Sequence, residues 1–537
     1  MTHQIDSSGR LLRSAWWTLA VIVVVLVIAI RIRLLGIPLE RDEGEYAYAG
    51  QLILQGIPPY QLAYNMKFPG TYAAYAAIMS IFGQTITGVH VGLLLVNAVT
   101  IILIFFLGRQ LVNSVAGLAA GTTYAVLSVS PSVLGFAGHA THYVLLPVLG
   151  GTLLLVNPTD RQAWGRLFAS GLLFGIGLLM KQPAVFFALF GTIYLVSRDL
   201  HRRVRAREIL VRVLTFGAGL VLPLGLTGLL LWQMGVFERF WFWTINYARQ
   251  YGSLVSFSQA QQLFSYSAKE VMNAGWPIWA LAGIGLVAGL WQKRTRTSAV
   301  FLLSFLFFSA LALCPGFYFR LHYFILVLPA VSLFTGVAIS TLSNLGVGRS
   351  IVVQFIPLLI LGSALAWPII AERKYFFEAS PVDASRMIYP ESPFAESVRI
   401  ADYLRENTTR SDTIAVLGSE PQIYFYSNRH SGTGYIYAYG LMEAQKYASQ
   451  MQQEMIREIE RARPKFLIFV VMPDSWLQRT ESERLIFAWA NEYTAQNYTV
   501  AGFVNMVAPD KTDYYFGSVP QSVPQLGKYI LIYERKS

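Results

Sequence analysis

The chain has 537 residues, of which 54% are hydrophobic and only 13% are charged. Soluble globular proteins carry about 25% charged residues, so this composition excludes an ordinary water-soluble protein. The formal net charge of +12 does not indicate nucleic-acid binding, because residues 1–370 hold 24 of the 42 Lys and Arg residues but only 10 of the 30 Asp and Glu residues. The single cysteine, Cys314, excludes an intramolecular disulfide.

Long apolar stretches in residues 12–370 predict about eleven transmembrane helices. The first runs from residue 12 to Ile30 and reaches the roughly 20 residues that a helix needs to cross a bilayer. Arg10 and Arg13 precede it and no small-residue cleavage site follows it, so we interpret it as an uncleaved first span. The other stretches are residues 86–107, 115–133, 143–157, 167–180, 183–197, 213–233, 276–291, 298–314, 321–341 and 351–370.

The basic residues between these stretches predict the orientation of the chain. Cytoplasmic loops are enriched in Lys and Arg, and with a cytoplasmic N-terminus every strong basic cluster falls on that side. The clusters are Arg109; Arg161 and Arg166; the six arginines from Arg198 to Arg212; Lys293, Arg294 and Arg296; and Arg349. We therefore expect a multi-pass protein of the inner (cytoplasmic) membrane, with residues 31–85, 234–275 and 371–537 outside the cytoplasm.

Residues 371–537 have the composition of a water-soluble domain. Helical periodicity in Ser397–Asn407 precedes a strand-like run, Thr413–Leu417, and a polar-faced helix, Glu443–Arg461, precedes an apolar strand, Phe466–Val471. Lys528–Tyr533 is the last candidate strand. Helices alternating with apolar strands predict an α/β domain. The predicted fold class is a polytopic α-helical membrane protein: residues 1–370 form the transmembrane module, with its first external loop at 31–85, and residues 371–537 form an extracytoplasmic α/β domain.

A dense acidic cluster follows the first predicted span. Four of the ten acidic residues in the first 370 positions lie within Glu40-Arg41-Asp42-Glu43-Gly44-Glu45. Like charges this close repel one another unless a metal, an arginine or a substrate compensates them. A solvated loop in which Arg41 pairs locally is an equally good interpretation. If the loop is helical, Asp42 and Tyr46 lie one turn apart and share a face.

Four segments of the chain together resemble a known superfamily. They are Asp42-Glu43 with Tyr46, Lys67-Phe68-Pro69-Gly70-Thr71-Tyr72, Leu178-Leu179-Met180-Lys181-Gln182-Pro183 and Phe317-Tyr318-Phe319-Arg320-Leu321-His322-Tyr323-Phe324. In this order they resemble the GT-C glycosyltransferases, and more closely glycosyltransferase family 39, with its protein O-mannosyltransferases and the related lipid A aminoarabinose transferases. Two features depart from the family pattern. Lys67-Phe68-Pro69 replaces a Lys-Pro-Pro motif, and the second external turn holds His139 and His142 where these enzymes often carry an acid.

The resemblance implies a GT-C-like fold in which residues 1–370 are the catalytic module. It also implies a glycosyltransferase that passes a hexose or pentose from a polyprenyl-phosphate lipid to an acceptor on the outer face. In an inverting transfer a carboxylate takes the proton of the acceptor hydroxyl, and Asp42 is the candidate general base. Glu43 is expected to orient the acceptor or to bind a cation. The expected partners are the lipid-linked donor, a glycan, lipid or protein acceptor, and membrane lipids, but no nucleic acid.

Positive charge must stabilise the phosphate that leaves the sugar. The candidates for this role are Lys67, Lys181, Arg320 and His322, and the candidates for sugar contact are Tyr46 and Tyr64. Several of these residues also have a structural interpretation. A lysine at a helix end, such as Lys181, more often extends its ammonium to the membrane surface, and Arg320 can pair with an acid.

The cofactor is unknown, and a divalent cation is the candidate. Its candidate ligands are Asp42, Glu43, His139 and His142. The two histidines are three residues apart, which is compatible with metal binding. However, two histidines without a third ligand more often serve as ordinary hydrogen-bonding residues.

Two other functions fit parts of the sequence. A transporter or flippase of a lipid-linked or anionic solute usually places ionisable residues in mid-membrane and has repeated halves. Here the apolar stretches are nearly free of ionisable groups, the acids lie in a loop, and no internal repeat is present, which favours the enzyme. A non-catalytic scaffold whose external domain binds cell-wall glycans is the third hypothesis.

Overall fold

The computed structural model describes residues 2–156, 163–293, 295–508, 510–517, 522 and 525–536. Contacts divide the described chain into two compact units. Unit 1 comprises residues 1–34, 91–227 and 255–378, and unit 2 comprises residues 35–90, 228–254 and 379–537. Arg161 and Arg294, which we assigned to cytoplasmic loops, lie outside the described residues.

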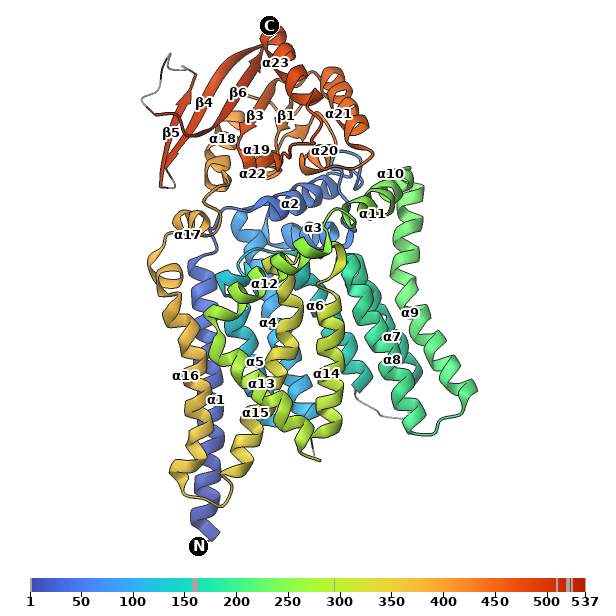
Figure 1. Ribbon diagram of the computed structural model, residues 1–537, viewed down its shortest axis with the longest axis vertical. Helices are drawn as coiled ribbons and strands as arrows, with labels where there is room; N and C mark the ends of the chain where they lie inside the picture. Colours follow the sequence, from blue (N-terminus) through green and yellow to red (C-terminus); the bar gives the residue numbers. More distant parts are fainter. Residues whose placement is uncertain are drawn as a thin grey trace. The chain divides into compact units, whose positions relative to one another are not determined.

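Unit 1 consists mainly of helices. Among the described residues, each of the eleven predicted apolar stretches contains one, and α12 is a further helix outside those stretches. They are drawn as long coiled ribbons in Figure 1. Their bounds are α1 (Thr2–Arg33), α4 (Ile86–Leu111), α5 (Ser114–Leu127), α6 (Ala140–Val156), α7 (Ala163–Met180), α8 (Val185–His201), α9 (Ala206–Gln233), α12 (Phe257–Ala274), α13 (Trp276–Trp291), α14 (Arg296–Leu311), α15 (Leu328–Leu345) and α16 (Ile351–Ala371). Short 3₁₀ turns include η1 (Pro131–Val133), η3 (Gln182–Ala184), η5 (Pro315–Phe317) and η6 (Leu321–Val327). Helices are expected here because a spanning segment in lipid must satisfy its own backbone hydrogen bonds.

Among the described residues, six helices are long and apolar enough to cross a membrane, or seven if α12 and α13, bent by 100° at their junction, form one broken span. Five further apolar helices are shorter: residues 70–82, 114–127, 140–156, 164–180 and 296–311. A membrane module of several apolar helices is thus confirmed, and the number of eleven spans stays a prediction.

Helix α15 is the most buried of the six long apolar helices. Glycines allow its neighbours to approach it at backbone distance. A Cβ atom on Gly336 would lie 2.4 Å from the carbonyl oxygen of Ala116 in α5, and one on Gly285 in α13 would lie 1.9 Å from that of Phe334. Such small-residue contacts are how membrane helices pack closely without a hydrophobic driving force between them.

Unit 2 contains a six-stranded sheet of order β2-β1-β3-β6-β4-β5. The strands are β1 (Thr413–Leu417), β2 (His430–Ser431), β3 (Phe466–Val471), β4 (Tyr498–Ala508), β5 (Lys511–Phe516) and β6 (Lys528–Arg535). Strand β1 pairs in parallel with β2 and β3, and the other pairs are antiparallel. The helices of residues 379–537 are α17 (Pro381–Ile388), α18 (Phe394–Glu406), α19 (Gln422–Ser427), α20 (Tyr439–Met442), α21 (Ala448–Ala462), α22 (Pro473–Trp476) and α23 (Leu485–Asn497). The predicted C-terminal α/β domain is confirmed, with β1 and β3 at the predicted bounds.

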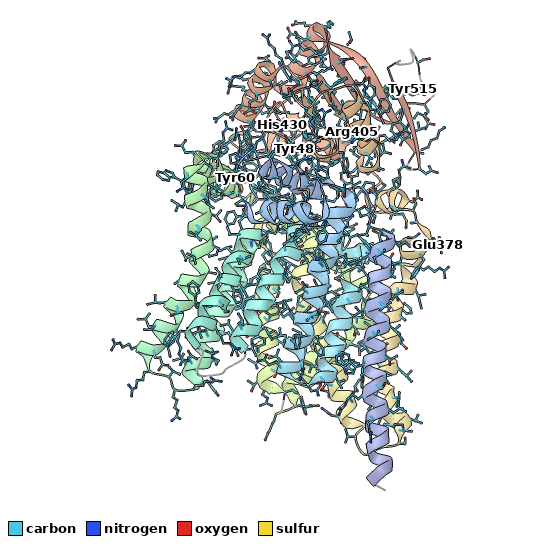
Figure 2. The ribbon with its side chains drawn as sticks, turned by 180° about the vertical axis from the view of Figure 1, so that it is seen from behind. Tyr48, Tyr60, Glu378, Arg405, His430 and Tyr515 are labelled. Carbon is cyan, nitrogen blue, oxygen red and sulfur yellow. The ribbon has the colours of Figure 1, made fainter. Side chains whose placement is uncertain are left out.

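Unit 2 also contains parts of the chain that we predicted to belong with the transmembrane module. These are α2 (Arg41–Leu54), α3 (Gly70–Phe82), α10 (Phe237–Trp241), the π-helical turn Phe242–Tyr247 and α11 (Ala248–Tyr251). We predicted a single boundary at residue 370, but the contacts of α2 place it in the same unit as the C-terminal domain. The hydroxyl of Tyr48, labelled in Figure 2, accepts a hydrogen bond of 2.8 Å from the backbone of Ser431, and its ring stacks on Tyr424. Eleven of the fourteen residues of α2 are buried.

Gly44 marks the closest approach of α2 to α19. A Cβ atom at Gly44 would lie 2.7 Å from both the backbone nitrogen and the Cβ of Gln422. We expect Gly44→Ala to lower stability by about 1–3 kcal/mol, because an added methyl group in a closely packed contact forces backbone shifts. Thermal unfolding in detergent measures this. Gly217→Ala is the matched control, since a Cβ there meets nothing within 4 Å, and its melting temperature should not fall. Equal melting temperatures for the two variants would contradict the close approach.

Candidate active site

The acidic cluster forms the first turn of α2. The carboxylate of Glu40 accepts a hydrogen bond from the backbone N–H of Glu43, and the carboxylate of Glu43 accepts one from the backbone N–H of Glu40. This reciprocal cap satisfies N–H groups that the helix leaves unpaired, and acids at this end also interact favourably with the helix dipole. Glu43 is 1% exposed, and its other oxygen lies 3.2 Å from Nε2 of His90. Two of the four acids are therefore engaged in capping the N-terminus of the helix.

The other two acids share the ammonium of Lys67. Its Nζ lies 2.8 Å from Oδ1 of Asp42 and 2.8 Å from Oε2 of Glu45. The same ammonium lies 4.6 Å from the ring centre of Tyr46. The hydroxyl of Tyr437 donates to Oδ1 of Asp42 over 3.2 Å. The Asp42 side chain is 18% exposed and that of Glu45 is 1% exposed, so Asp42 is the carboxylate of this pair that a substrate can reach.

Glu45 is the buried anchor of the cluster. Besides Lys67 it accepts hydrogen bonds from the side chains of Asn65 at 2.7 Å and Tyr72 at 2.6 Å. Burial raises the pKa of the Glu45 carboxyl, and the charge of Lys67 opposes that rise. Burial also acts to lower the pKa of Lys67, but the carboxylates of Asp42 and Glu45 outweigh it and raise the pKa of Lys67 well above its ordinary value. The ammonium therefore stays charged at neutral pH.

The two tyrosines predicted to contact sugar are buried in unit 2. Tyr46 is 2% exposed and packs edge-on against Tyr75. Tyr64 is 4% exposed, stacks on Trp243, and donates a hydrogen bond of 2.9 Å to Glu458. The ring of Tyr46 thus lies beside the ammonium of Lys67, whereas Tyr64 joins the segment between α2 and α3 to the helix α21. A sugar contact stays a prediction for both.

Unit 1 holds most of the remaining candidates. The rings of His139 and His322 stack with their centres 3.9 Å apart. Lys181 places its Nζ 4.0 Å from the ring centre of Tyr323, whose ring in turn packs edge-on against His322. Three candidates from separate turns of unit 1, at η3, η6 and the start of α6, thus lie in one cluster. The ammonium of Lys181 is the charged group of this cluster that can bind an anion.

The other two candidates in unit 1 differ in exposure. Arg320 is exposed and lies 5.6 Å from the ring of Tyr318. His142 is 1% exposed and belongs to the first turn of α6. Neither placement tests its predicted role.

Two residues that contact the candidates or the segments carrying them were not predicted from the sequence. Tyr437 approaches Asp42 from a position 395 residues away in the chain, and no local pattern signals such a contact. Arg31 is another: it is 5% exposed and donates to the backbone oxygens of Ser128 and Gly135, which fixes the loop before His139. The sequence does contain a signal for Arg31, because a charged residue at the end of an apolar span usually has a partner.

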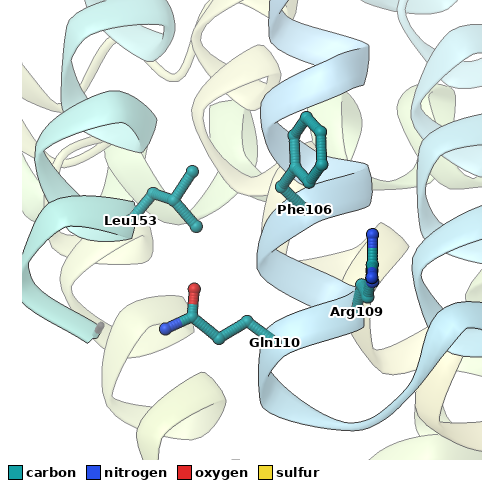
Figure 3. Close-up of a pocket in the computed structure, with 4 residues that line it drawn as sticks. All are labelled: Phe106, Arg109, Gln110 and Leu153. Carbon is teal, nitrogen blue, oxygen red and sulfur yellow. The ribbon is translucent and has the colours of Figure 1, made fainter. Parts of the chain in front are cut away.

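A surface pocket lies elsewhere in unit 1. It is lined by Phe106, Arg109, Gln110 and Leu153, on α4 and α6 (Figure 3). These residues differ from all the candidates named above. Arg109 is exposed in the last turn of α4, at the end that we predicted to be cytoplasmic.

Comparisons with known proteins agree with the family resemblance that the sequence predicts. Residues 67–226 match the family model described as dolichyl-phosphate-mannose-protein mannosyltransferase. The fold is similar to that of apo ArnT from Cupriavidus metallidurans, with 15% identity, a TM-score of 0.59, and coverage of 97% of this chain and 98% of that chain. The same enzyme bound to undecaprenyl phosphate matches with 13% identity and a TM-score of 0.57, covering 96% of this chain and 98% of that chain.

A second solved structure has the same general fold. The archaeal oligosaccharyltransferase AglB from Archaeoglobus fulgidus, in complex with an inhibitory peptide and a dolichol-phosphate, matches with 12% identity and a TM-score of 0.51. The match covers 94% of this chain and 75% of that chain. Among curated proteins, none matches the sequence. The predicted resemblance to the GT-C glycosyltransferases is confirmed, and the fold is that of a multi-pass membrane protein.

The ion pairs of Lys67 with Asp42 and Glu45 allow a prediction about stability. In Lys67→Met, two neighbouring carboxylates lose their cation, and breaking such a pair costs about 3 kcal/mol. We expect a large fall in melting temperature at pH 8 and a smaller one at pH 5. Glu45, whose pKa burial already raises, takes up a proton more readily in the folded than in the unfolded chain, so lowering the pH stabilises the folded variant.

The double variant Lys67→Met/Glu45→Gln is the control for this prediction. Because it removes one of the two uncompensated charges, it should be more stable than Lys67→Met at pH 8. A Lys67→Met variant that melts equally far below the wild type at both pH values would show that the carboxylates do not depend on Lys67.

Proposed function

We propose that the chain is a membrane glycosyltransferase that moves a sugar from a polyprenyl-phosphate donor to a hydroxyl acceptor at the outer face of the cytoplasmic membrane. The observation that carries this proposal is the partly exposed carboxylate of Asp42, held at 2.8 Å from the ammonium of Lys67. The family model that matches residues 67–226 and the similarity in fold to ArnT and AglB support the class of reaction. The acceptor is a glycan, a lipid or a protein.

The reaction follows from the chemistry of these groups. The acceptor oxygen attacks the anomeric carbon, the bond from that carbon to the phosphate oxygen breaks, and its electron pair leaves with the phosphate. Asp42 takes the proton of the acceptor hydroxyl as general base. Lys67 keeps Asp42 in the ionised form that a base requires, because a neighbouring cation favours the charged state of a carboxylate. Glu43 caps the turn that carries Asp42 and orients the acceptor through it.

Cations stabilise the departing lipid phosphate in this proposal. Lys181, Arg320 and His322 of unit 1 are assigned to it. An ammonium has three N–H donors, and Asp42 and Glu45 account for two of those of Lys67, so Lys67 can also donate to the phosphate. A divalent cation bound by Asp42, Glu43, His139 or His142 stays a prediction, and loss of activity on chelation that returns with added metal tests it.

The orientation of the chain is part of the proposal. A cytoplasmic N-terminus and an extracytoplasmic C-terminal domain place α2 on the outer side. A reporter enzyme that is active only outside the cytoplasm, joined to the C-terminus, should be active. If this reporter is inactive, and a reporter that works only in the cytoplasm is active at the same position, the chain has the opposite orientation.

Asp42→Asn tests the base. The purified variant in detergent, given a labelled polyprenyl-phosphate sugar and an acceptor, should release polyprenyl phosphate about 100–10,000-fold more slowly than the wild type, since that is the usual contribution of a general base. Asp402→Asn, which changes an exposed carboxylate on α18, is the matched control and should keep wild-type activity. Turnover that survives in Asp42→Asn would remove Asp42 from this role. Movement of intact donor across sealed liposomes without cleavage would favour a flippase instead.

The cations that we assign to the phosphate of the sugar donor allow a separate prediction. Lys181→Met and Arg320→Met should each weaken donor binding about 10–100-fold, because a hydrogen bond to a charged group contributes about 1.5–3 kcal/mol. The KM for the donor measures this effect. Arg349→Met removes a cation from a loop predicted to be cytoplasmic and should leave that KM unchanged. If the Lys181 and Arg320 variants bind the donor as the wild type does, these cations do not hold its phosphate.

A further inference from the structure

The C-terminal sheet has a topological switch point at the carboxyl end of β1. From β1 the chain passes through α19 to β2 on one side, and it then returns through α21 to β3 on the other side. Open α/β sheets bind their ligands in the crevice outside the carboxyl ends of strands at such a point. The residues that form this crevice are Gly418, Ser419 and Glu420 after β1, and Pro473 to Trp476 (α22) after β3.

The two loops of the crevice are joined by buried hydrogen bonds. The backbone N–H of Ser419 donates to Oγ of Ser475 at 2.9 Å, and the Ser419 hydroxyl donates to the carbonyl of Ser475 at 2.6 Å. The Ser475 hydroxyl donates to Oε2 of Glu420 at 2.7 Å. Ser419, Glu420 and Ser475 are each 0% exposed. Glu420 is therefore a buried carboxylate whose Oε2 accepts hydrogen bonds from Ser419 and Ser475, while its Oε1 faces a cation.

Arg41, the first residue of α2, occupies this crevice. Its Nε donates to the carbonyl of Ser419 at 2.6 Å, and a terminal nitrogen lies 3.4 Å from Oε1 of Glu420. The guanidinium lies over the rings of Phe394 and Tyr439, at 5.4 and 5.3 Å from their centres. Arg41 is 8% exposed. The place where this kind of domain binds a ligand thus holds a side chain from the domain's own unit, about 380 residues away in the sequence.

A second set of hydrogen bonds connects the same crevice to Asp42. The Ser419 hydroxyl accepts a hydrogen bond of 2.8 Å from the backbone N–H of Ala438, and the neighbouring Tyr437 donates through its hydroxyl to Asp42. Asp42 itself directly follows Arg41 in the chain. The crevice therefore constrains Asp42 through its backbone on one side and through a hydrogen bond to its carboxylate on the other.

We propose that Arg41 and Glu420 are positioning residues, and that the C-terminal domain uses its ligand crevice to hold the first turn of α2 so that Asp42 meets Lys67. This inference rests on the proposed function, in which Asp42 is the base. Arginine suits the position better than lysine, because its planar fork reaches a carbonyl, a carboxylate and two aromatic faces together. The domain is then a part of the catalytic apparatus, rather than a separate acceptor-binding module.

A buried Arg–Glu pair elsewhere in the same domain provides the control. Arg386 lies 2.6 Å from Glu396, which is 0% exposed and also accepts a hydrogen bond from Thr512. Glu396→Gln and Glu420→Gln make the same chemical change in two buried ion pairs. Both are expected to lower the melting temperature, because each removes the buried carboxylate that pairs with an arginine, Arg41 in one case and the partly buried Arg386 in the other. Only Glu420 contacts Arg41, so only its variant should disturb Asp42.

The experiment measures two properties of the full-length wild type, Arg41→Lys, Glu420→Gln and Glu396→Gln. The first is the kinetics of polyprenyl-phosphate release, where kcat should fall about 10–100-fold in Arg41→Lys and Glu420→Gln with little change in KM, as expected for a base displaced by about 1 Å. The second is the rate at which an amine-reactive acylating reagent labels Lys67, measured by peptide mass spectrometry. Lys67 should react several-fold faster in these two variants, because its contacts with Asp42 are loosened. Glu396→Gln should match the wild type in both.

Three results would be decisive against the proposal or its premise. Unchanged kcat and unchanged Lys67 labelling in Arg41→Lys and Glu420→Gln would overturn the positioning role. The same changes in Glu396→Gln would also overturn it, because they would follow from any loss of stability in the domain. A wild-type protein that releases no polyprenyl phosphate would overturn the proposed function, while the labelling rates would still decide whether Arg41 and Glu420 position Asp42.

Discussion

The ammonium of Lys67 compensates the two carboxylates of Asp42 and Glu45, and the arrangement of unit 2 depends on that compensation. Four acids within six residues repel one another, so a helix can begin at this point only if each acid has a partner. Glu40 and Glu43 cap the helix, Glu45 is buried among hydrogen-bond donors, and Asp42 retains some exposure. The same contacts that allow the helix to form leave the carboxylate of Asp42 partly exposed.

The division of the chain into two units gives each unit a distinct physical task. In unit 1, apolar helices with glycine contacts provide a framework in which charged groups are few, so the cluster of Lys181, His139 and His322 stands out. In unit 2, the C-terminal α/β domain supplies the polar and aromatic partners that a charged helix requires. Helix α2, which carries the acidic cluster, is buried against α19 and β2 of the C-terminal domain.

The sequence predicted the parts of the structure that local patterns determine. Long apolar stretches predicted the helices of unit 1, and short apolar runs predicted the strands β1 and β3. The resemblance to a family singled out Asp42 as a base and Lys67 as a phosphate-binding cation, but their ion pair was not predicted and comes from the structure. The hairpin of β4 and β5 was missed, because its polar and aromatic residues lack a clear alternation. The contacts of Arg41 with Glu420 and of Asp42 with Tyr437 join residues more than 370 positions apart, and only the tertiary fold brings them together.

The pH dependence of kcat/KM tests most directly whether an ionised carboxylate beside Lys67 carries the reaction. The wild type should lose activity about tenfold per pH unit on the acidic side, where the base takes up its proton. In Lys67→Met the residual activity should show the same limb at higher pH, because the carboxylate loses the ammonium that lies 2.8 Å away. A wild-type profile without an acidic limb, or a limb that stays in place when Lys67 is removed, would contradict the account.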